Sequence, residues 1–473
     1  AGATGGTTDE GTPFTLAGSA SGGDTTWAAS GGTGTCSFSD ATSPTSPVTC
    51  TDDGTYTLTL TANDHVNPPV SASTTLTVTN VPPKAALTLP TGPQPLAGSV
   101  SADVAISDPG ADTFTCSLDW GDGTVTGGTV SGSACQGAHT YAAGGTWIVG
   151  ATVTDDDGGI GTDSGAVTID SPPTVTFPTL APSGDEGSAI PISATTADDG
   201  TTASHWTATP DAGNSAGSSC TIADPSSLST SATCNDNGTF TLTLAVDDGV
   251  NPTVTAGETL TVANVAPTVH ITNATVSGGT TVTLAAAVAD AGTNDVLTCS
   301  IDWGDGATSV VTAVAGACNA THTYAGSGRR TITVTGSDDD GGSSSASATV
   351  TLDQPPSCAA VTTSLATLWP PNGTFVTVTL SGAADADGDP LAYSIDGVTQ
   401  DEPVAGAPDA QRLGGSGLRL RAQRDGAGDG RVYIVSYSVS DGRLSCAGTV
   451  RVTVAHDQAH AALLSAHSYN SLG

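Results

Sequence analysis

The ten cysteines of this chain fall into pairs that recur at fixed spacings, and this pattern limits the possible folds more than any other feature. A spacing of 14 residues occurs twice, a spacing of 19 residues occurs twice, and a last pair brackets the C-terminal region. The pairs are Cys36 with Cys50, Cys220 with Cys234, Cys116 with Cys135, Cys299 with Cys318, and Cys358 with Cys446. We therefore predict five local disulfides, one per unit, and each small loop contributes about 3 kcal/mol to stability. Zinc binding is the alternative, but no CxxC motif or Cys/His cluster occurs.

The sequence around these cysteines is also repeated, at a distance of 183 or 184 residues. TCSLDWGDG at 115–123 returns as TCSIDWGDG at 298–306, and DEGTPFTL at 9–16 returns as DEGSAIPI at 185–192. The order is A-B-A-B followed by a distinct fifth unit, and each unit has the length of one β-sandwich. Short joints that contain proline, such as NVPP at 80–83, predict a semi-rigid rod. The predicted units are 1–81 (A1), 82–171 (B1), 172–265 (A2), 266–354 (B2) and 355–457 (the C-terminal unit), followed by a tail at 458–473.

Apolar and polar residues alternate with a period of two in the stretches between turns. TYTLTLTA at 55–62 and TFTLTLAV at 239–246 have the pattern of half-buried β-strands. The predicted fold class is all-β, a linear array of five immunoglobulin-like β-sandwich modules. The sequence contains no GxSxG nucleophile motif, and paired cysteines leave no free thiol. We therefore expect no catalytic residues and no enzyme activity.

Units B1 and B2 resemble PKD domains, an immunoglobulin-like family common in extracellular and cell-surface proteins. The resemblance rests on DWGDG at 119–123 and 302–306, HTY at 139–141 and 322–324, and DDDGG at 155–159 and 338–342. The A units look like divergent relatives that lack the WGDG turn. The C-terminal unit, with LWPPNGTFVTVTL at 368–380, resembles a module of secreted bacterial repeat proteins. As a whole the chain resembles the tandem PKD and PKD-like domains of secreted bacterial or archaeal surface proteins.

The aromatic residues of these motifs are predicted to be structural. Trp120 and Trp303 are expected to pack in the core against a disulfide, and stacking on a sugar is the alternative. His139 and His322 are expected to pack and to form hydrogen bonds rather than to act as catalysts.

The chain is strongly acidic, with a formal net charge of −36, and nearly all of its acidic residues are Asp. Lys84 is the only basic residue before Arg329, which argues against a nucleic-acid partner. Closely spaced carboxylates repel one another, and a bound Ca²⁺ ion relieves that repulsion. Some PKD domains bind calcium at loops of this kind, so the resemblance also implies a calcium cofactor. The candidate ligands are Asp122, Asp155, Asp156, Asp157, Asp305, Asp338, Asp339, Asp340, Asp385, Asp387 and Asp389. Turns in a solvated acidic surface, or a high-salt habitat, are the alternatives.

Disulfides indicate an extracellular or cell-surface location. No apolar run is long enough to span a membrane, and the start at Ala1 without any Met is typical of a mature secreted chain. We hypothesise a non-enzymatic extracellular structural protein, the subunit of a fibre or filament, a surface layer or an adhesive stalk. The alternative is a set of polysaccharide- or protein-binding accessory modules of a secreted hydrolase.

The two terminal segments are candidates for self-association. Residues 1–8 are small and uncharged, and residues 459–473 carry Leu463, Leu464 and Tyr469 without a formal charge. We expect at least one terminus to dock on the next subunit and form a linear polymer. The alternative is a tail that folds back on its own module.

Overall fold

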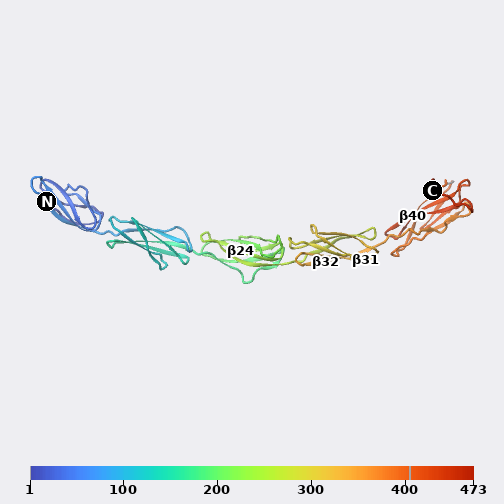
Figure 1. Cartoon of the computed structure of the whole chain (residues 1–473), viewed down its shortest axis with the longest axis horizontal. Helices are drawn as coiled ribbons and strands as arrows, with labels where there is room; N and C mark the ends of the chain where they lie inside the picture. The colour runs from blue at the N-terminus through green and yellow to red at the C-terminus, as the bar shows by residue number, and fades with distance from the viewer. Residues whose placement is uncertain (1, 404–405, 473) are drawn as a thin grey trace.

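The computed structural model describes residues 2–403 and 406–472, and within these ranges it contains β-strands and no helix. The strands form five β-sandwiches joined end to end in a long, gently curved rod, with the two chain termini in the outermost sandwiches (Figure 1). Each sandwich has its own hydrophobic core. The predicted all-β array of immunoglobulin-like modules is confirmed.

Modules A1 and A2 share one design, in which a four-stranded sheet packs on a three-stranded sheet. In A1 the sheets have the orders β1-β7-β6-β3 and β2-β5-β4, and in A2 the orders β18-β25-β24-β21 and β19-β23-β22, with a small β17-β20 pair. The strands of A1 are β1 (Gly6–Asp9), β2 (Phe14–Thr15), β3 (Asp24–Gly31), β4 (Cys36–Phe38), β5 (Pro47–Cys50), β6 (Gly54–Asn63) and β7 (Val70–Thr79). Those of A2 are β17 (Thr174–Thr176), β18 (Ser183–Asp185), β19 (Ala189–Ser193), β20 (Thr195–Ala197), β21 (Ala203–Pro210), β22 (Cys220–Ile222), β23 (Ser229–Cys234), β24 (Gly238–Asp247) and β25 (Val254–Ala263).

Modules B1 and B2 also consist of two packed sheets. In B1 these have the orders β13-β14-β10-β8 and β12-β11-β15-β16-β9, and in B2 the orders β26-β27-β30 and β29-β28-β31-β32. The strands of B1 are β8 (Lys84–Thr88), β9 (Gln94–Pro95), β10 (Ser99–Ser107), β11 (Phe114–Asp119), β12 (Val125–Gly127), β13 (Thr129–Ser131), β14 (Ala134–Thr140), β15 (Gly145–Asp155) and β16 (Ile160–Asp170). Those of B2 are β26 (Thr268–Ser277), β27 (Thr281–Ala289), β28 (Thr298–Asp302), β29 (Thr308–Thr312), β30 (Ala317–Thr323), β31 (Gly328–Ser337) and β32 (Ser343–Leu352).

The fifth module packs a four-stranded sheet, β33-β35-β38-β37, on a five-stranded sheet, β34-β40-β39-β36-β41. Its strands are β33 (Thr362–Thr363), β34 (Thr367–Leu368), β35 (Phe375–Ser381), β36 (Ala392–Gln400), β37 (Ala410–Gly414), β38 (Gly417–Arg421), β39 (Gly430–Ser440), β40 (Ser445–Ala455) and β41 (Tyr469–Asn470). The last strand lies in the segment that the sequence analysis describes as a tail.

The period-two pattern explains why these segments are strands with one face in the core. In β6, Tyr56, Leu58 and Leu60 point inward and are buried, while the threonines between them face outward. The β-branched and aromatic residues suit this half-buried, pleated surface. Burying one such side chain contributes about 1.5–3 kcal/mol, so repeated alternation over several strands is enough to define each core.

The disulfides have the pairing that the cysteine spacing predicts. They join Cys36 to Cys50, Cys116 to Cys135, Cys220 to Cys234, Cys299 to Cys318, and Cys358 to Cys446. In the A modules the bridge joins neighbouring strands of one sheet. In the B modules it joins the two sheets of the sandwich, because its cysteines lie in β11 and β14, or in β28 and β30.

The DWGDG and HTY motifs together form one end of each B core. Trp120 is fully buried in the same cluster as the disulfide, and the Tyr141 hydroxyl donates a hydrogen bond of 3.0 Å to the Trp120 carbonyl oxygen. His139 stacks on the indole and lies 2.7 Å from an oxygen of Asp122. The same contacts recur around Trp303 in B2. The structural role predicted for these residues is therefore confirmed, and the buried indoles offer no face to a sugar.

Both terminal segments contact their own modules. Strand β1 pairs in parallel with β7 of A1. At the other end, Tyr469 and Asn470 pair with β36, and Ser471 is buried beneath them. Leu463 and Leu464 nevertheless remain exposed, so folding of the C-terminal segment onto its module leaves those two apolar side chains in water.

Candidate metal site at the joints between modules

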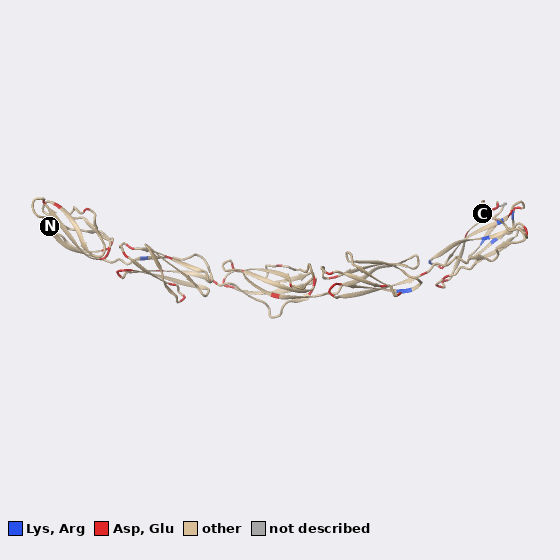
Figure 2. Ribbon diagram, in the orientation of Figure 1, with Lys and Arg blue, Asp and Glu red and all other residues tan. Residues whose placement is uncertain are grey.

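Acidic residues, red in Figure 2, gather at the joints of the rod. At the A1–B1 joint, Glu10 follows β1, Asp52 precedes β6, and Asp112 precedes β11 of the next module. One carboxylate oxygen from each of these three residues lies within 4.8 Å of the others. The joint thus brings together carboxylates from two modules. These residues are far apart in the sequence, so their proximity is not visible from the sequence alone.

Burial at the joint and a hydrogen bond from a backbone N–H hold the Glu10 side chain in this cluster. It is only 1% exposed, and its Oε1 accepts a hydrogen bond of 2.8 Å from the backbone N–H of Val81. Its Oε2 is buried and has no hydrogen-bond partner among the described residues, and neither oxygen of Asp112 has one. Both side chains face Gly110, where an added Cβ would lie 2.6 Å from Asp112 Oδ2 and 2.7 Å from Glu10 Oε2. Unpartnered oxygens that converge on one point are the donor set a hard cation such as Ca²⁺ requires.

The raised pKa values of the carboxyl groups at the joint also support a cation site. Burial, reinforced by the charges of Glu10 and Asp108, raises the pKa of Asp112 to about 7. Burial is also the main cause of the raised pKa of Glu10. Carboxylates that resist ionisation beside one another lose that penalty when a cation binds between them.

The A2–B2 joint repeats the arrangement. Glu186 of A2 forms a cluster with Asp290 and Asp295 of B2, so here the second carboxylate comes from the following module. Glu186 Oε1 accepts a hydrogen bond of 2.7 Å from the Val265 N–H. Glu186 is fully buried, and its Oε2 and both oxygens of Asp295 again have no hydrogen-bond partner among the described residues. Burial, together with the charges of Glu186 and Asp290, raises the pKa of Asp295 to about 7. The site is therefore a repeated feature of A–B pairs.

The B1–A2 joint is closed differently, by direct hydrogen bonds. Asn251 of A2 accepts a hydrogen bond of 3.0 Å from the Leu96 N–H and donates one of 2.8 Å to Asp170 Oδ2. The joint before the fifth module contains Asp353, Asp387 and Asp441 around a shallow cavity. At the latter joint the Gln354 N–H donates a 2.9 Å hydrogen bond to Asp387.

The structure separates the predicted metal ligands into three groups. The triplets Asp155, Asp156, Asp157 and Asp338, Asp339, Asp340 lie at the A–B joints, beside the clusters described above. Asp385, Asp387 and Asp389 lie in the loop before the fifth module's β36, where Asp385 accepts hydrogen bonds from three backbone N–H groups of its own turn. Asp122 and Asp305 lie at the opposite ends of their modules from the triplets, and each has an oxygen bonded to a histidine.

Sequence analysis did not include Glu10, Asp52, Asp112 or their counterparts among the candidate ligands. A signal was present, because Glu is rare in this chain and the DEG motif places one Glu at the same position of both A modules. What the sequence did not reveal is that these residues meet the Asp triplet of the following module.

In the absence of divalent cations, we expect the stability of the A–B pairs to fall as the pH rises from about 4 to 7. Asp112 and Asp295 each have a folded-state pKa of about 7, above the ordinary value of 3.8. A carboxyl with a raised pKa contributes stability below its unfolded pKa, and that contribution is lost as the pH rises through the folded value. Scanning calorimetry with chelator measures this. The double variant D112N/D295N should flatten the pH dependence, and an unchanged slope would contradict the assignment.

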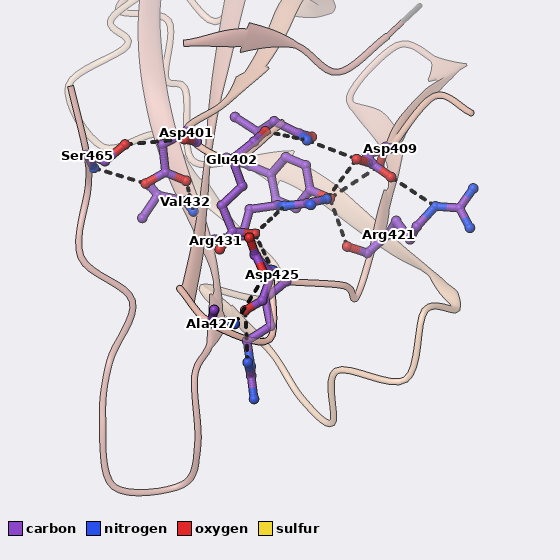
Figure 3. A network of polar contacts seen from close by, with 12 residues as sticks. Asp401, Glu402, Asp409, Arg421, Asp425, Ala427, Arg431, Val432 and Ser465 are labelled. Atoms are coloured by element: carbon purple, nitrogen blue, oxygen red, sulfur yellow. Dashed lines mark hydrogen bonds and ion pairs between the residues drawn. The ribbon is translucent and has the colours of Figure 1, made fainter. Parts of the chain in front are cut away.

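A second polar cluster lies inside the fifth module, where Arg431 is 3% exposed (Figure 3). Its guanidinium lies 2.8 Å from Asp409 and 3.2 Å from Glu402, and Asp409 also pairs with Arg421 at 3.1 Å. Beside it, Asp401 accepts hydrogen bonds from the N–H groups of Val432 and Ser465 and so ties the C-terminal segment to β39. These charges are already paired with one another, so we interpret the cluster as structural.

Comparisons with known proteins identify the modules. The PKD domain family matches residues 80–169 and 264–353. Among solved structures, the human desmocollin-1 ectodomain is 14% identical over 96% of this chain and 97% of its own, with a TM-score of 0.27. The first eight immunoglobulin domains of Down syndrome cell adhesion molecule are 14% identical over 95% and 67%, with a TM-score of 0.26. The titin I-band fragment I67–I69 is 16% identical over 55% and 96%, with a TM-score of 0.29. No curated protein matches the chain.

The chain is thus a tandem array of immunoglobulin-like β-sandwich modules. Two of these modules, B1 and B2, are PKD domains. Disulfides together with PKD domains are typical of extracellular proteins. Within the described ranges, no helix long and apolar enough to cross a membrane is found.

Proposed function

We propose that this protein is a non-enzymatic extracellular structural rod, the subunit of a fibre, surface layer or adhesive stalk, whose A–B joints are locked by calcium. The observation that carries the proposal is the repeated cluster of buried, unpartnered carboxylate oxygens contributed by two modules at once. The two PKD domains, set in a rod of five sandwiches that each contain a disulfide, support a scaffold role.

The chemistry of the joint favours calcium over other cations. The ligands are all oxygens, and they come from loops that tolerate the six to eight contacts that Ca²⁺ prefers. Mg²⁺ demands a tighter octahedral geometry and retains several waters, and zinc sites normally include His or Cys ligands, which this cluster does not contain. When bound, calcium would neutralise the repulsion between Glu10 and Asp112 and fix the angle between the two modules.

Small-angle X-ray scattering tests the proposal. Addition of Ca²⁺ to chelated protein should lengthen the rod and narrow its distribution of shapes, because two of the four joints become fixed. The double variant E10Q/E186Q should lose this response. E258Q, which changes a glutamate within strand β25, should keep it. If Mg²⁺ or NaCl alone produced the same change, the effect would be general charge screening and the calcium site would be wrong.

A further inference from the structure

At each joint of the rod, a corresponding loop of the second module contacts the first module. This loop connects the last two long strands of its own module, and it lies against the end of the last long strand of the module before it. At the first joint, Asn80 after β7 donates to Asp155 in the β15–β16 loop, and at the third joint, Asn264 donates to Asp338. At the second joint, Asn251 in the β24–β25 loop bonds to Asp170 at the end of β16.

The joint before the fifth module follows the same rule. Asp441 and Arg443, in the β39–β40 loop, line one cavity together with Asp353, which directly follows β32. Four consecutive joints thus place the same loop against the end of the same strand, although the contacts differ and the modules belong to three sequence types.

Module A1 carries this loop as well, at the outer tip of the rod. NDHVNP at 63–68 corresponds to DDGVNP at 247–252. Asp64 Oδ1 accepts hydrogen bonds from the N–H groups two and three residues ahead, as Asp248 Oδ1 does, and the residue after each aspartate has a positive φ. The free loop at 63–68 therefore has the same backbone conformation as the loop at 247–252, which is docked in its joint. Whereas Asn251 is 8% exposed in its joint, Asn67 is exposed and its neighbour Val66 is 86% exposed.

The far end of the fifth module presents the complementary surface. The last long strand, β40, ends at Ala455, and His456 and Asp457 directly after it line a groove of about 600 Å³. This is the position that Asn80 and Asp353 occupy at the internal joints. The groove is mainly apolar, and it includes Leu463, which is 64% exposed. The ionisable residues that line the groove are Asp429, Asp457, His456 and His460.

We propose that the 63–68 loop of one copy docks in the groove at His456, Asp457 and Leu463 of a second copy, so that the rods join head to tail. This contact between two molecules would resemble the contact between neighbouring modules within one chain. Because the two surfaces differ, the interface is heterologous and propagates into a linear polymer instead of closing into a dimer. The proposal rests on the structural role above, and it uses surfaces other than the terminal strands, which are paired within their own modules.

The affinity should be low, because internal joints benefit from a covalent linker that supplies an effective concentration in the millimolar range. We therefore expect polymerisation of the full chain at about 0.1–1 mM protein with Ca²⁺. Sedimentation velocity measures the mass, and negative-stain electron microscopy measures the particle length. V66D and L463D should each remain monomeric, since burial of a carboxylate in an apolar contact is costly. L180D, a change at another exposed leucine, should polymerise like the unmodified chain.

Mixing the two variants gives the decisive test. V66D retains an intact groove and L463D retains an intact loop, so an equal mixture should form dimers and nothing longer. Polymers that survive V66D would overturn the loop assignment and point to exchange of the C-terminal segment. An unmodified chain that stays monomeric at 1 mM would overturn self-association. The calcium-dependent stiffening measured by scattering on single rods would be unaffected by that result, so the two proposals fail separately.

Discussion

Replacing Arg431 with methionine should lower the free energy of unfolding of the fifth module by about 3–5 kcal/mol. The change removes the cation between Asp409 and Glu402, both of which are buried, and leaves two carboxylates without their main partner. A single module has a stability of roughly 5–15 kcal/mol, so the loss is a large fraction of the total. Scanning calorimetry of the full chain should show one transition moving to much lower temperature while the others stay in place.

The control for this variant is R419M, which changes an exposed arginine on strand β38 of the other sheet. It should alter stability by less than about 0.5 kcal/mol. The triple variant R431M/D409N/E402Q should recover part of the loss, because a buried amide costs less than a buried carboxylate. An equal effect of R431M and R419M would show that the network contributes nothing to stability.

Calcium should raise the melting temperature of the A–B pairs by about 10 °C or more when its free concentration is 100 times the dissociation constant. A ligand that binds only the folded state at that concentration contributes about 2.7 kcal/mol. For a module of this size, each kcal/mol shifts the melting temperature by about 4–8 °C. The site takes ligands from both modules of a pair, so unfolding of either one releases the ion.

The two copies of the site supply an internal control. E10Q should abolish the shift for the A1–B1 pair and leave the A2–B2 pair responsive, and E186Q should do the reverse. Calorimetry of each variant, with chelator and with Ca²⁺, measures both transitions in one scan. If E10Q and E186Q each left both shifts intact, Glu10 and Glu186 would not be ligands and the calcium would lie elsewhere on the acidic surface.

Local sequence features were sufficient to predict the fold of each module. Alternation in stretches such as β6 determines which side chains face the core, and this depends only on neighbouring residues. Buried Trp120 was also predictable, because DWGDG, HTY and a cysteine pair occur together in both B units. Repetition helped further, since each prediction could be made twice from independent segments.

The candidate metal site was only half predictable. The triplet beginning at Asp155 is visible as a run of carboxylates, but Glu10 and Asp112 lie outside any such run. They meet only because A1 and B1 pack end to end, and that relation follows from the joint rather than from either module. Asp122 stays a predicted ligand, and part of its surroundings was also not visible in the local sequence. It lies in an acidic turn of the expected type, yet His139, 17 residues away, bonds to its carboxylate.

The pairing of an early strand with the last long strand of a module has a consequence for a rod under tension. Parallel ladders join β1 to β7, β9 to β16, β18 to β25 and β34 to β40, so each pairs a strand near the start of its module with the last long strand. A pull on the two ends slides such strands along each other, and all of the ladder's hydrogen bonds must break together. In B2 the first strand, β26, pairs instead with β27, and no ladder between β26 and β32 occurs in the part of the chain that the structure describes. We therefore expect B2 to be the module least protected against stretching. Because B2 lies inside the rod, its lengthening would leave the two end modules folded.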